Sequence, residues 1–158
     1  MSDNINPSIS LRFLAQPGDV NFGGKVHGGA VMKWIDQAGY VCAANWSGMY
    51  CVTVYVGGIR FYRPVAIGDI VEVTAGIIYT GNTSMHVSID VFAGNPRLRD
   101  KEKTTHCVMV FAAVNDLGKT VAVPKWTPFT PEQKSLEDYA RRLMDLRKVI
   151  EDEMKPYL

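Results

Sequence analysis

The sequence lacks the features that mark several large classes of protein. It has 158 residues, only three cysteines and three histidines, and no run of about 18 apolar residues of the kind that crosses a membrane. Its 17 Lys and Arg residues are balanced by 16 Asp and Glu residues, and a net charge of +1 argues against a dedicated nucleic-acid binder. Residues 1–8 are polar and lack the apolar core of a secretion signal, so we expect a cytoplasmic protein.

The cysteines and histidines are too few and too scattered to form a familiar metal site. Cys42, Cys51 and Cys107 each lie in an apolar stretch, and no two of them have C-x-x-C spacing. An odd number of cysteines in a reducing compartment indicates free, buried thiols. A nucleophilic cysteine stays open as an alternative, although no histidine or acid accompanies one in an obvious motif. We therefore expect neither a bound metal nor a cofactor.

What the chain does contain is a regular succession of predicted strands. Alternating or β-branched apolar residues predict strands at residues 8–15, 51–62, 70–80, 84–92 and 103–114. A pair of glycines, Gly57-Gly58, interrupts the second of these segments and suggests a β-bulge.

One long helix is predicted between the first and second strands. Residues 30–44 contain almost no helix breakers, and polar residues recur among them at helical spacing. Apolar residues cover much of the circumference, which predicts a helix that is buried on most sides. Strands joined by short turns imply one antiparallel sheet, and its apolar face needs a cover that this helix supplies. The expected architecture is α+β, an antiparallel sheet wrapped around a long central helix.

The C-terminal residues predict a second helix of a different kind. Thr130, Pro131 and Gln133 have the spacing of a capping box with proline in the first turn. Apolar residues then recur at helical spacing, namely Leu136, Tyr139, Leu143, Leu146 and Ile150. We expect an amphipathic helix that packs on the body of the protein or on a neighbouring subunit. The chain accordingly divides into a first domain, residues 1–128, and a helical extension, residues 129–158.

The segment around the start of the first helix contains three features suited to chemistry at a carbonyl group. Gly28 and Gly29 open the helix, where free backbone N–H groups can stabilise an oxygen that gains negative charge. Asp36 lies nearly two turns beyond Gly29 on the same face, roughly 10 Å further along the helix. Asn21 lies in the preceding loop, where its side-chain amide can hold a water molecule or a carbonyl group. His27 stands beside the helix start, where we expect it to fix the loop.

Less specific interpretations of these residues stay open at this point. Asp36 could face solvent, or it could pair with Lys33 one turn earlier on the helix. Paired glycines at a helix start often serve only close packing. His86 and His106 lie in predicted strands, and we expect them to be ordinary strand residues.

The order of these residues resembles the acyl-CoA thioesterases of the hotdog superfamily, especially the cytosolic acyl-CoA hydrolase branch. The shared pattern is Asn-x-x-Gly-x-x-His-Gly-Gly followed by a helical acid. In this chain it comprises Asn21, Gly24, His27, Gly28, Gly29 and Asp36. Further matching segments lie at residues 60–65, 68–69 and 80–84, and the resemblance covers about residues 10–125.

The resemblance implies a fold and a reaction. It implies a hotdog fold that hydrolyses acyl-CoA to a free carboxylic acid and CoA, with coenzyme A entering only as part of the substrate. It also implies a homo-oligomer, a dimer at least, with a tetramer or hexamer as larger alternatives. The balanced charge and the absence of a long apolar run already predict no nucleic-acid or membrane partner. The alternatives are a hotdog enoyl-CoA hydratase and a hotdog protein that binds acyl-CoA without turnover.

The resemblance also implies roles for particular residues. Asn21 and Asp36 would act on the thioester from opposite protomers, and Asp36 would activate water or attack the thioester itself. The N–H groups of Gly28 and Gly29 would stabilise the oxyanion. The residues implied to contact the CoA moiety are Arg63, Thr83 and Ser84.

Overall fold

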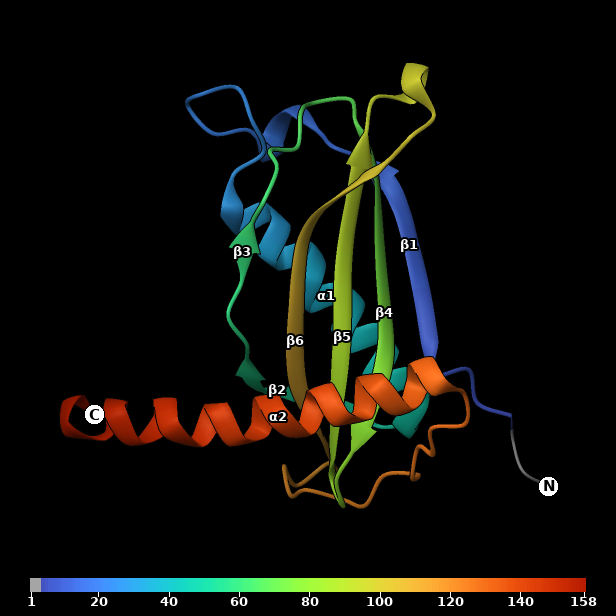
Figure 1. Ribbon diagram of the computed structural model, residues 1–158, viewed down its shortest axis with the longest axis vertical. Helices are drawn as coiled ribbons and strands as arrows, with labels where there is room; N and C mark the ends of the chain where they lie inside the picture. Colours follow the sequence, from blue (N-terminus) through green and yellow to red (C-terminus); the bar gives the residue numbers. More distant parts are fainter. Residues whose placement is uncertain (1–3) are drawn as a thin grey trace.

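An antiparallel sheet with a long helix on each face makes up the part of the chain that the computed structural model describes, residues 4–158 (Figure 1). The elements in chain order are β1 (Ser8–Leu14), η1 (Pro17–Asp19), α1 (Gly28–Ser47), β2 (Tyr50–Val56), β3 (Arg60–Phe61), β4 (Ile70–Thr80), β5 (Ser84–Gly94), η2 (Pro96–Leu98), β6 (Glu102–Val114), α2 (Pro131–Met154) and η3 (Lys155–Tyr157). No helix within these residues is long and apolar enough to cross a membrane.

The strand order places β5 near the centre of the sheet and β2 at one edge. The sheet runs β1-β4-β5-β6-β2, and the short β3 also pairs with β6. The hairpin of β4 and β5 pairs Ile70 with Gly94 at one end and Thr80 with Met85 at the other. Apolar residues alternate along each central strand, so one face of the sheet is buried against α1. The expected antiparallel sheet around a long helix is confirmed.

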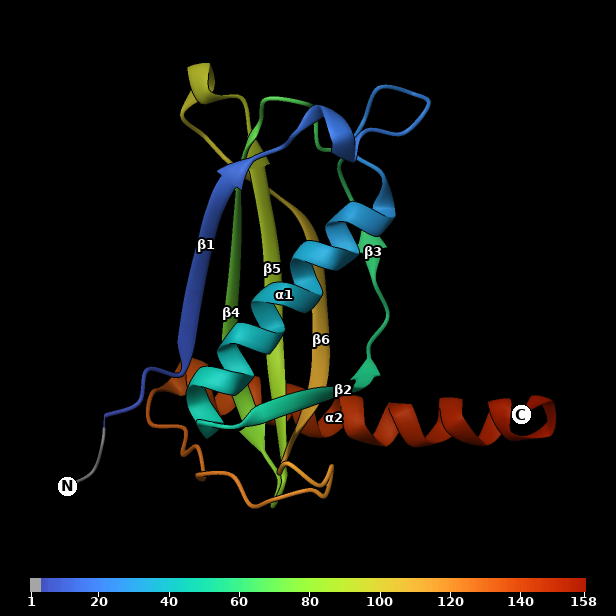
Figure 2. The ribbon, with the colours of Figure 1, turned by 180° about the vertical axis from the view of Figure 1, so that it is seen from behind.

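Helix α1 crosses one face of this sheet diagonally (Figure 2). It begins two residues before the predicted helix and ends three residues after it. Its buried residues are Ala30, Val31, Trp34, Ile35, Ala38, Gly39, Cys42, Ala43 and Trp46. The opposite side remains exposed and includes Met32, Asp36 and Val41. The expectation of a helix buried on most sides is therefore wrong for a single chain, because its own sheet covers only one side.

A glycine lets α1 approach the centre of the sheet. A Cβ atom added to Gly39 would lie 2.8 Å from Phe111 Cε2 and 2.9 Å from Ile89 Cδ1. Both contacted side chains are fully buried and cannot easily move aside. The absence of a side chain at this position thus determines how closely helix and sheet pack.

The double glycine between β2 and β3 does not form the predicted bulge. Residues 57–59 interrupt the strand, and the register shift against β6 lies earlier, between Thr53 and Tyr55. Gly57 donates to the carbonyl of Val108 at 2.9 Å, and a Cβ atom there would lie 2.7 Å from that oxygen. Gly57 therefore serves a close approach of two backbones.

Helix α2 crosses the outer face of the sheet, opposite α1, and its C-terminal half extends past the β2 edge (Figure 1). The predicted capping box is confirmed: the Thr130 side chain accepts from the Gln133 amide, and the Gln133 side chain accepts from the Thr130 amide. Ala140 is fully buried against Ile78 and Val108 of the sheet. The expectation that this amphipathic helix packs on the body is met by its first half.

A hydrogen-bonded chain of side chains ties α2 to the sheet. His106 Nδ1 lies 2.8 Å from Asp90 Oδ1, and His106 Nε2 lies 3.0 Å from the Tyr139 hydroxyl. Burial opposes the charge on Asp90, but hydrogen bonds from His106 and Lys103 outweigh it and lower the pKa of that carboxyl. His106 is thus not the ordinary strand residue that the sequence suggested, since it links β5, β6 and α2.

His86 makes the stability of the fold depend on pH. Its side chain is only 5% exposed, and burial together with the charge of Arg147 lowers its pKa from 6.5 to about 4. The unfolded chain therefore binds a proton at a higher pH than the folded chain does, so stability is lost as the pH falls from about 6.5 to 4. We expect His86→Leu to remove this component. The free energy of unfolding in urea is measured for the variant and for the native protein, and the difference between the two should be constant above pH 6.5 and should change below it. A constant difference down to pH 4 would contradict the expectation.

Candidate active site

A groove at the N-terminal end of α1 gathers three of the predicted site residues. It has a volume of about 440 Å³ and is bordered by Asn21, Gly28 and Arg63. Val26, Val31 and Val65 supply apolar walls on the same groove. The loop before α1, the helix start and the segment after β3 therefore meet at one opening.

The helix start offers the free backbone donors that the sequence predicted. His27 is the N-cap: its Nδ1 accepts from the Ala30 amide at 3.0 Å, and its carbonyl accepts from the Val31 amide at 3.4 Å. The N–H groups of Gly28 and Gly29 have no acceptor within residues 4–158. The helix dipole adds positive potential at the same place. His27 thus fixes the loop as expected, and two amides remain for a ligand oxygen.

Hydrogen bonds within its own loop fix the side chain of Asn21 and determine which of its atoms can contact a ligand. Its Oδ1 accepts from the amides of Gly23 at 2.9 Å and Lys25 at 3.2 Å. Its Nδ2 has no acceptor among the described residues. Asn21 is therefore positioned as a hydrogen-bond donor toward the groove rather than as an acceptor.

Asp36 lies on the exposed side of α1 and has a partner that the sequence did not indicate. Thr53 of β2 donates from its hydroxyl to Asp36 Oδ1 at 3.1 Å. The alternative pairing with Lys33 is absent from the ion pairs of residues 4–158. Thr53 is a polar residue within the otherwise apolar strand β2, and that contrast was the available signal for its role.

Asn21 and Asp36 do not share a pocket within one chain. Asp36 lies outside the groove that Asn21 borders. The exposed apolar residues of α1 and β2 are Met32, Val41, Tyr50, Val52, Val54 and Val56, of which Val54 lines a crevice beneath α2, and the exposed polar residues Lys33 and Gln37 flank Asp36 on α1. The outer edge of β2 pairs with no strand within residues 4–158. The acid therefore lies on the exposed side of α1 and is held by Thr53 of the strand whose outer edge is unpaired.

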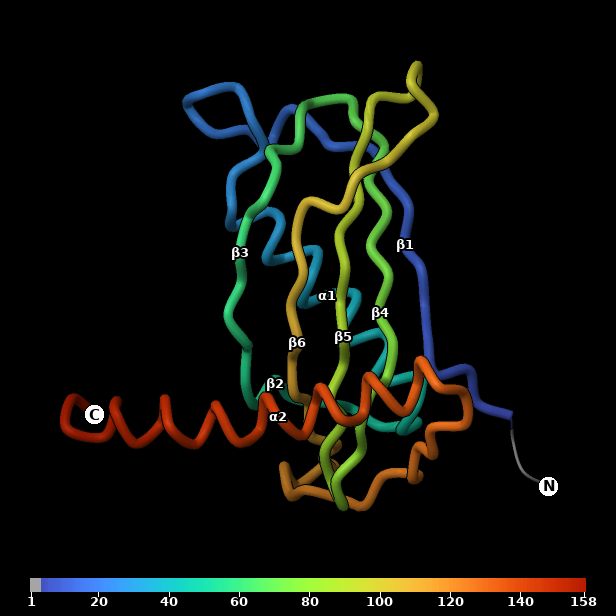
Figure 3. Tube along the Cα trace, in the orientation of Figure 1, coloured from blue at the N-terminus to red at the C-terminus, as the bar shows by residue number. Residues whose placement is uncertain are grey.

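The residues expected to contact CoA lie far apart in one chain. Arg63 borders the groove and pairs with Glu102 at 2.7 Å. Thr83 and Ser84 lie at the turn between β4 and β5, at the opposite end of the sheet from the loop that carries Asn21 (Figure 3). Ser84 borders a different crevice, which runs beneath α2. The structure therefore brings Arg63 to the groove but not the other two residues.

The cysteines are buried thiols. Burial raises the pKa of Cys42 to about 12 and that of Cys107 to about 11, and it also raises the pKa of Cys51. Only a thiolate attacks a thioester effectively, so these values argue against a cysteine nucleophile. The prediction of free, buried cysteines is confirmed.

Comparisons with known proteins identify the family of the chain. A family described as "Thioesterase superfamily" matches residues 23–99. Acyl-CoA thioester hydrolase YciA of Escherichia coli is 36% identical over 120 residues, which span 73% of this chain and 90% of YciA. An acyl-CoA hydrolase of Staphylococcus aureus, solved with butyryl coenzyme A, is 25% identical, has a TM-score of 0.87 and aligns over 96% of this chain and 93% of its own.

A third relative is the hexameric thioesterase y2039 of Yersinia pestis. It is 36% identical, with a TM-score of 0.68, and it aligns over 73% of this chain and 93% of its own. The relatives found by sequence identity and those found by fold belong to the same family, and each match spans most of the relative's length. The chain therefore belongs to the hotdog-fold acyl-CoA hydrolases of the thioesterase superfamily.

Proposed function

We propose that this protein hydrolyses acyl-CoA thioesters to CoA and free carboxylic acids at a site completed by a second copy of the chain. The observation that carries the proposal is the position of Asp36. It is oriented by Thr53 of β2, the strand with an unpaired edge, and it lies on the exposed side of α1 together with Met32 and Val41. An acid held in place on an exposed surface that also carries apolar side chains is the arrangement expected where a second copy completes the site.

A homodimer formed along β2 accounts for this surface. Antiparallel pairing of two β2 edges would continue the sheet and satisfy backbone groups that are otherwise a liability. It would also bury the exposed valines at positions 52, 54 and 56. Two solved relatives are described as hexamers, which supports a homo-oligomer here as well.

The chemistry follows from the donors and acceptors that each copy offers. Asp36 of one copy takes a proton from a water molecule, whose oxygen attacks the thioester carbonyl carbon. The amides of Gly28 and Gly29 stabilise the oxyanion, each donor lowering the barrier by roughly 3 kcal/mol. The amide of Asn21 from the other copy orients the water or the carbonyl. Direct attack by Asp36 to give a mixed anhydride is the less favoured alternative.

The leaving group needs no strong acid. A thiol with a pKa of about 8.5 departs readily as a thiolate, so a site without a catalytic histidine is sufficient. The reaction uses side chains and water, and coenzyme A enters only as part of the substrate. Arg63 at the groove is a candidate contact for a CoA phosphate. Thr83 and Ser84 can contribute only from a different copy or to a different part of CoA.

The S. aureus hydrolase supports the pairing of Asp36 with Thr53. Structures of that enzyme have been solved with one aspartate replaced by alanine and with one threonine replaced by alanine. The two replaced residues have the same spacing along their chain as Asp36 and Thr53 have here.

Thr53 is expected to act through Asp36 as a positioning residue. Thr53→Val removes the hydroxyl and should lower kcat by about tenfold with little change in KM, since one hydrogen bond to a charged group is lost. Thr53→Ser keeps the hydroxyl and should retain most of the turnover. Steady-state kinetics with an acyl-CoA substrate measure both variants. Equal losses in the two variants would show that packing, rather than the hydrogen bond, matters at this position.

A substrate panel tests the function as a whole. Short, medium and long acyl-CoAs are supplied to the native protein, and release of free thiol is followed. Thiol release from at least one of them is expected. Hydration of an enoyl-CoA without thiol release would favour the hydratase. Binding of acyl-CoA with no turnover across the panel would favour a sensor.

A further inference from the structure

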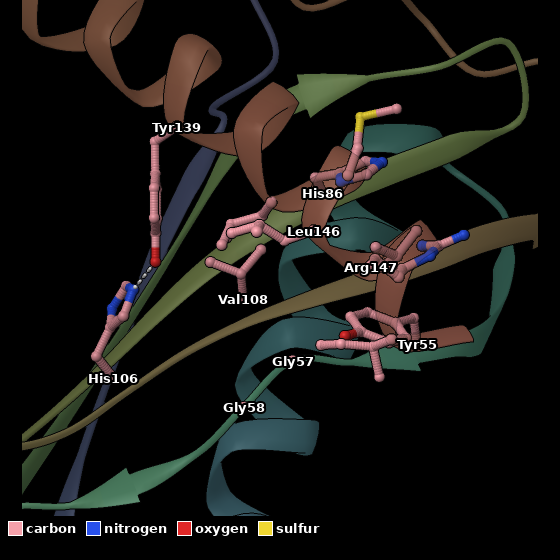
Figure 4. A pocket seen from close by; sticks show the side chains of 13 residues that line it. Tyr55, Gly57, Gly58, His86, His106, Val108, Tyr139, Leu146 and Arg147 are labelled. Carbon is pink, nitrogen blue, oxygen red and sulfur yellow. Dashed lines mark hydrogen bonds between the residues drawn. The ribbon is translucent and has the colours of Figure 1, made fainter. Parts of the chain in front are cut away.

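A second cavity lies on the side of the sheet opposite the proposed active site. It lies between α2 and the outer face of the sheet, is partly open to solvent and has a volume of about 170 Å³ (Figure 4). Val108 and Val110 form its floor, and Leu143, Leu146 and Ile150 of α2 form its roof. The sheet separates this cavity from Asp36, and the groove that Asn21 borders shares no residue with it.

The cavity contains a buried polar side chain without a protein partner. His86 is 5% exposed, lines the cavity and has no hydrogen-bond partner within residues 4–158. Since no unpaired side-chain nitrogen in that part of the chain is sealed from solvent, the ring nitrogens of His86 are accessible, and His86 borders both this cavity and the crevice beside Ser84. A polar group that is otherwise buried is normally satisfied. His86 is therefore positioned to bond a molecule inside the cavity.

A cation, Arg147, lies at this end of the cavity. Arg147 lines the same space, its guanidinium lies 4.8 Å from the centre of the Tyr55 ring, and its Nε pairs with Glu151 at 3.1 Å. Burial and the positive charge of Arg147 together lower the pKa of His86. At another wall, Tyr139 is held by His106, and its oxygen can still accept a hydrogen bond. The remaining walls are mostly apolar.

We propose that this cavity binds a small amphipathic carboxylate, with its apolar body between α2 and the sheet and its carboxylate between His86 and Arg147. A cavity of roughly 150 Å³ in another protein holds benzene, so the present one suits a body of about six carbon atoms. The proposal does not depend on thioester hydrolysis, although a carboxylic acid is also the class of product that hydrolysis would release. A ligand here would brace α2 against the sheet.

Hexanoate and benzoate are the probes for a binding test. Each is titrated into the full-length protein while NMR follows the imidazole resonances of His86 and His106. Saturable binding is expected, with a rise in the pKa of His86 because a carboxylate favours its charged form. His86→Leu and Arg147→Met should each weaken binding at least about tenfold, since each removes a charge-assisted hydrogen bond.

Matched variants separate this site from the active site. Arg141→Met removes a cation from the same helix outside the cavity and should leave binding unchanged. Asp36→Asn should also leave it unchanged, whether or not the protein proves to be a thioesterase. Displacement of the probe by CoA, or binding that is insensitive to both His86→Leu and Arg147→Met, would overturn the proposal. So would the absence of saturable binding to the folded native protein.

Discussion

Replacing Asp36 by Asn is expected to reduce thioester hydrolysis at least about a hundredfold while leaving the protein folded. The amide has the size of the carboxylate, and its oxygen can still accept the hydrogen bond that Thr53 donates at 3.1 Å. It cannot take a proton from water, so the general-base step is lost. Because Asp36 is exposed in one chain and forms no ion pair with Lys33, its neutralisation should cost little stability. Free-thiol release measures the turnover, and thermal unfolding measures the stability.

Asp116→Asn is the matched control. Asp116 is exposed in the turn after β6, at the opposite end of the sheet from the loop that carries Asn21, and the same change of charge there should leave the rate unchanged. Native thiol release by Asp36→Asn would remove Asp36 from the mechanism. Loss of folding in that variant would show instead that the carboxylate is a structural group, which its exposure argues against.

The fold could be predicted because its strands and helices carry strong local patterns. Alternation along residues 70–80 and 84–92, with a Gly-Asn turn between them, predicts the β4–β5 hairpin that the structure contains. The spacing of Thr130 and Gln133 likewise locates the start of α2. The boundaries of α1 were less certain, since His27 rather than Ser, Thr, Asp or Asn caps it.

What the sequence could not reveal is which partner covers an apolar surface. The apolar residues of α1 look alike in the sequence, yet Ala38 packs against its own sheet while Met32 and Val41 remain exposed. Hydrophobicity shows that a side chain will be covered, but not whether the cover comes from its own chain. The prediction that α1 is buried on most sides failed for this reason.

Contacts between residues far apart in the sequence could not be predicted either. Thr53 lies 17 residues after Asp36, beyond the second half of α1 and the turn before β2, and no local pattern joins the two. The chain of hydrogen bonds from Asp90 through His106 to Tyr139 spans β5, β6 and α2. Such pairs depend on the register of strands and on where α2 crosses the sheet. The amide donors at the start of α1 could be predicted because Gly28, Gly29 and His27 are adjacent in the sequence.

Mixing two inactive variants is expected to restore activity. If Asn21 and Asp36 of one site come from different copies, a dimer of one Asn21→Ala chain and one Asp36→Asn chain contains one intact site and one doubly altered site. Random 1:1 reassociation makes half of the dimers mixed, so the mixture should recover about a quarter of the native turnover. Each variant alone should remain close to its own low rate.

The result depends on the geometry of a single chain. Asn21 borders a groove that excludes Asp36, and the surface around Asp36 is open beside the free edge of β2. Subunits are exchanged by mild denaturation and refolding, and thiol release is compared with that of the native protein treated in the same way. A doubly altered chain, Asn21→Ala with Asp36→Asn, mixed with native chains serves as the control, because its mixed dimers contain no intact site. Failure of the two single variants to complement each other, after native mass spectrometry has shown that mixed dimers form, would place both residues in one copy and exclude a shared site.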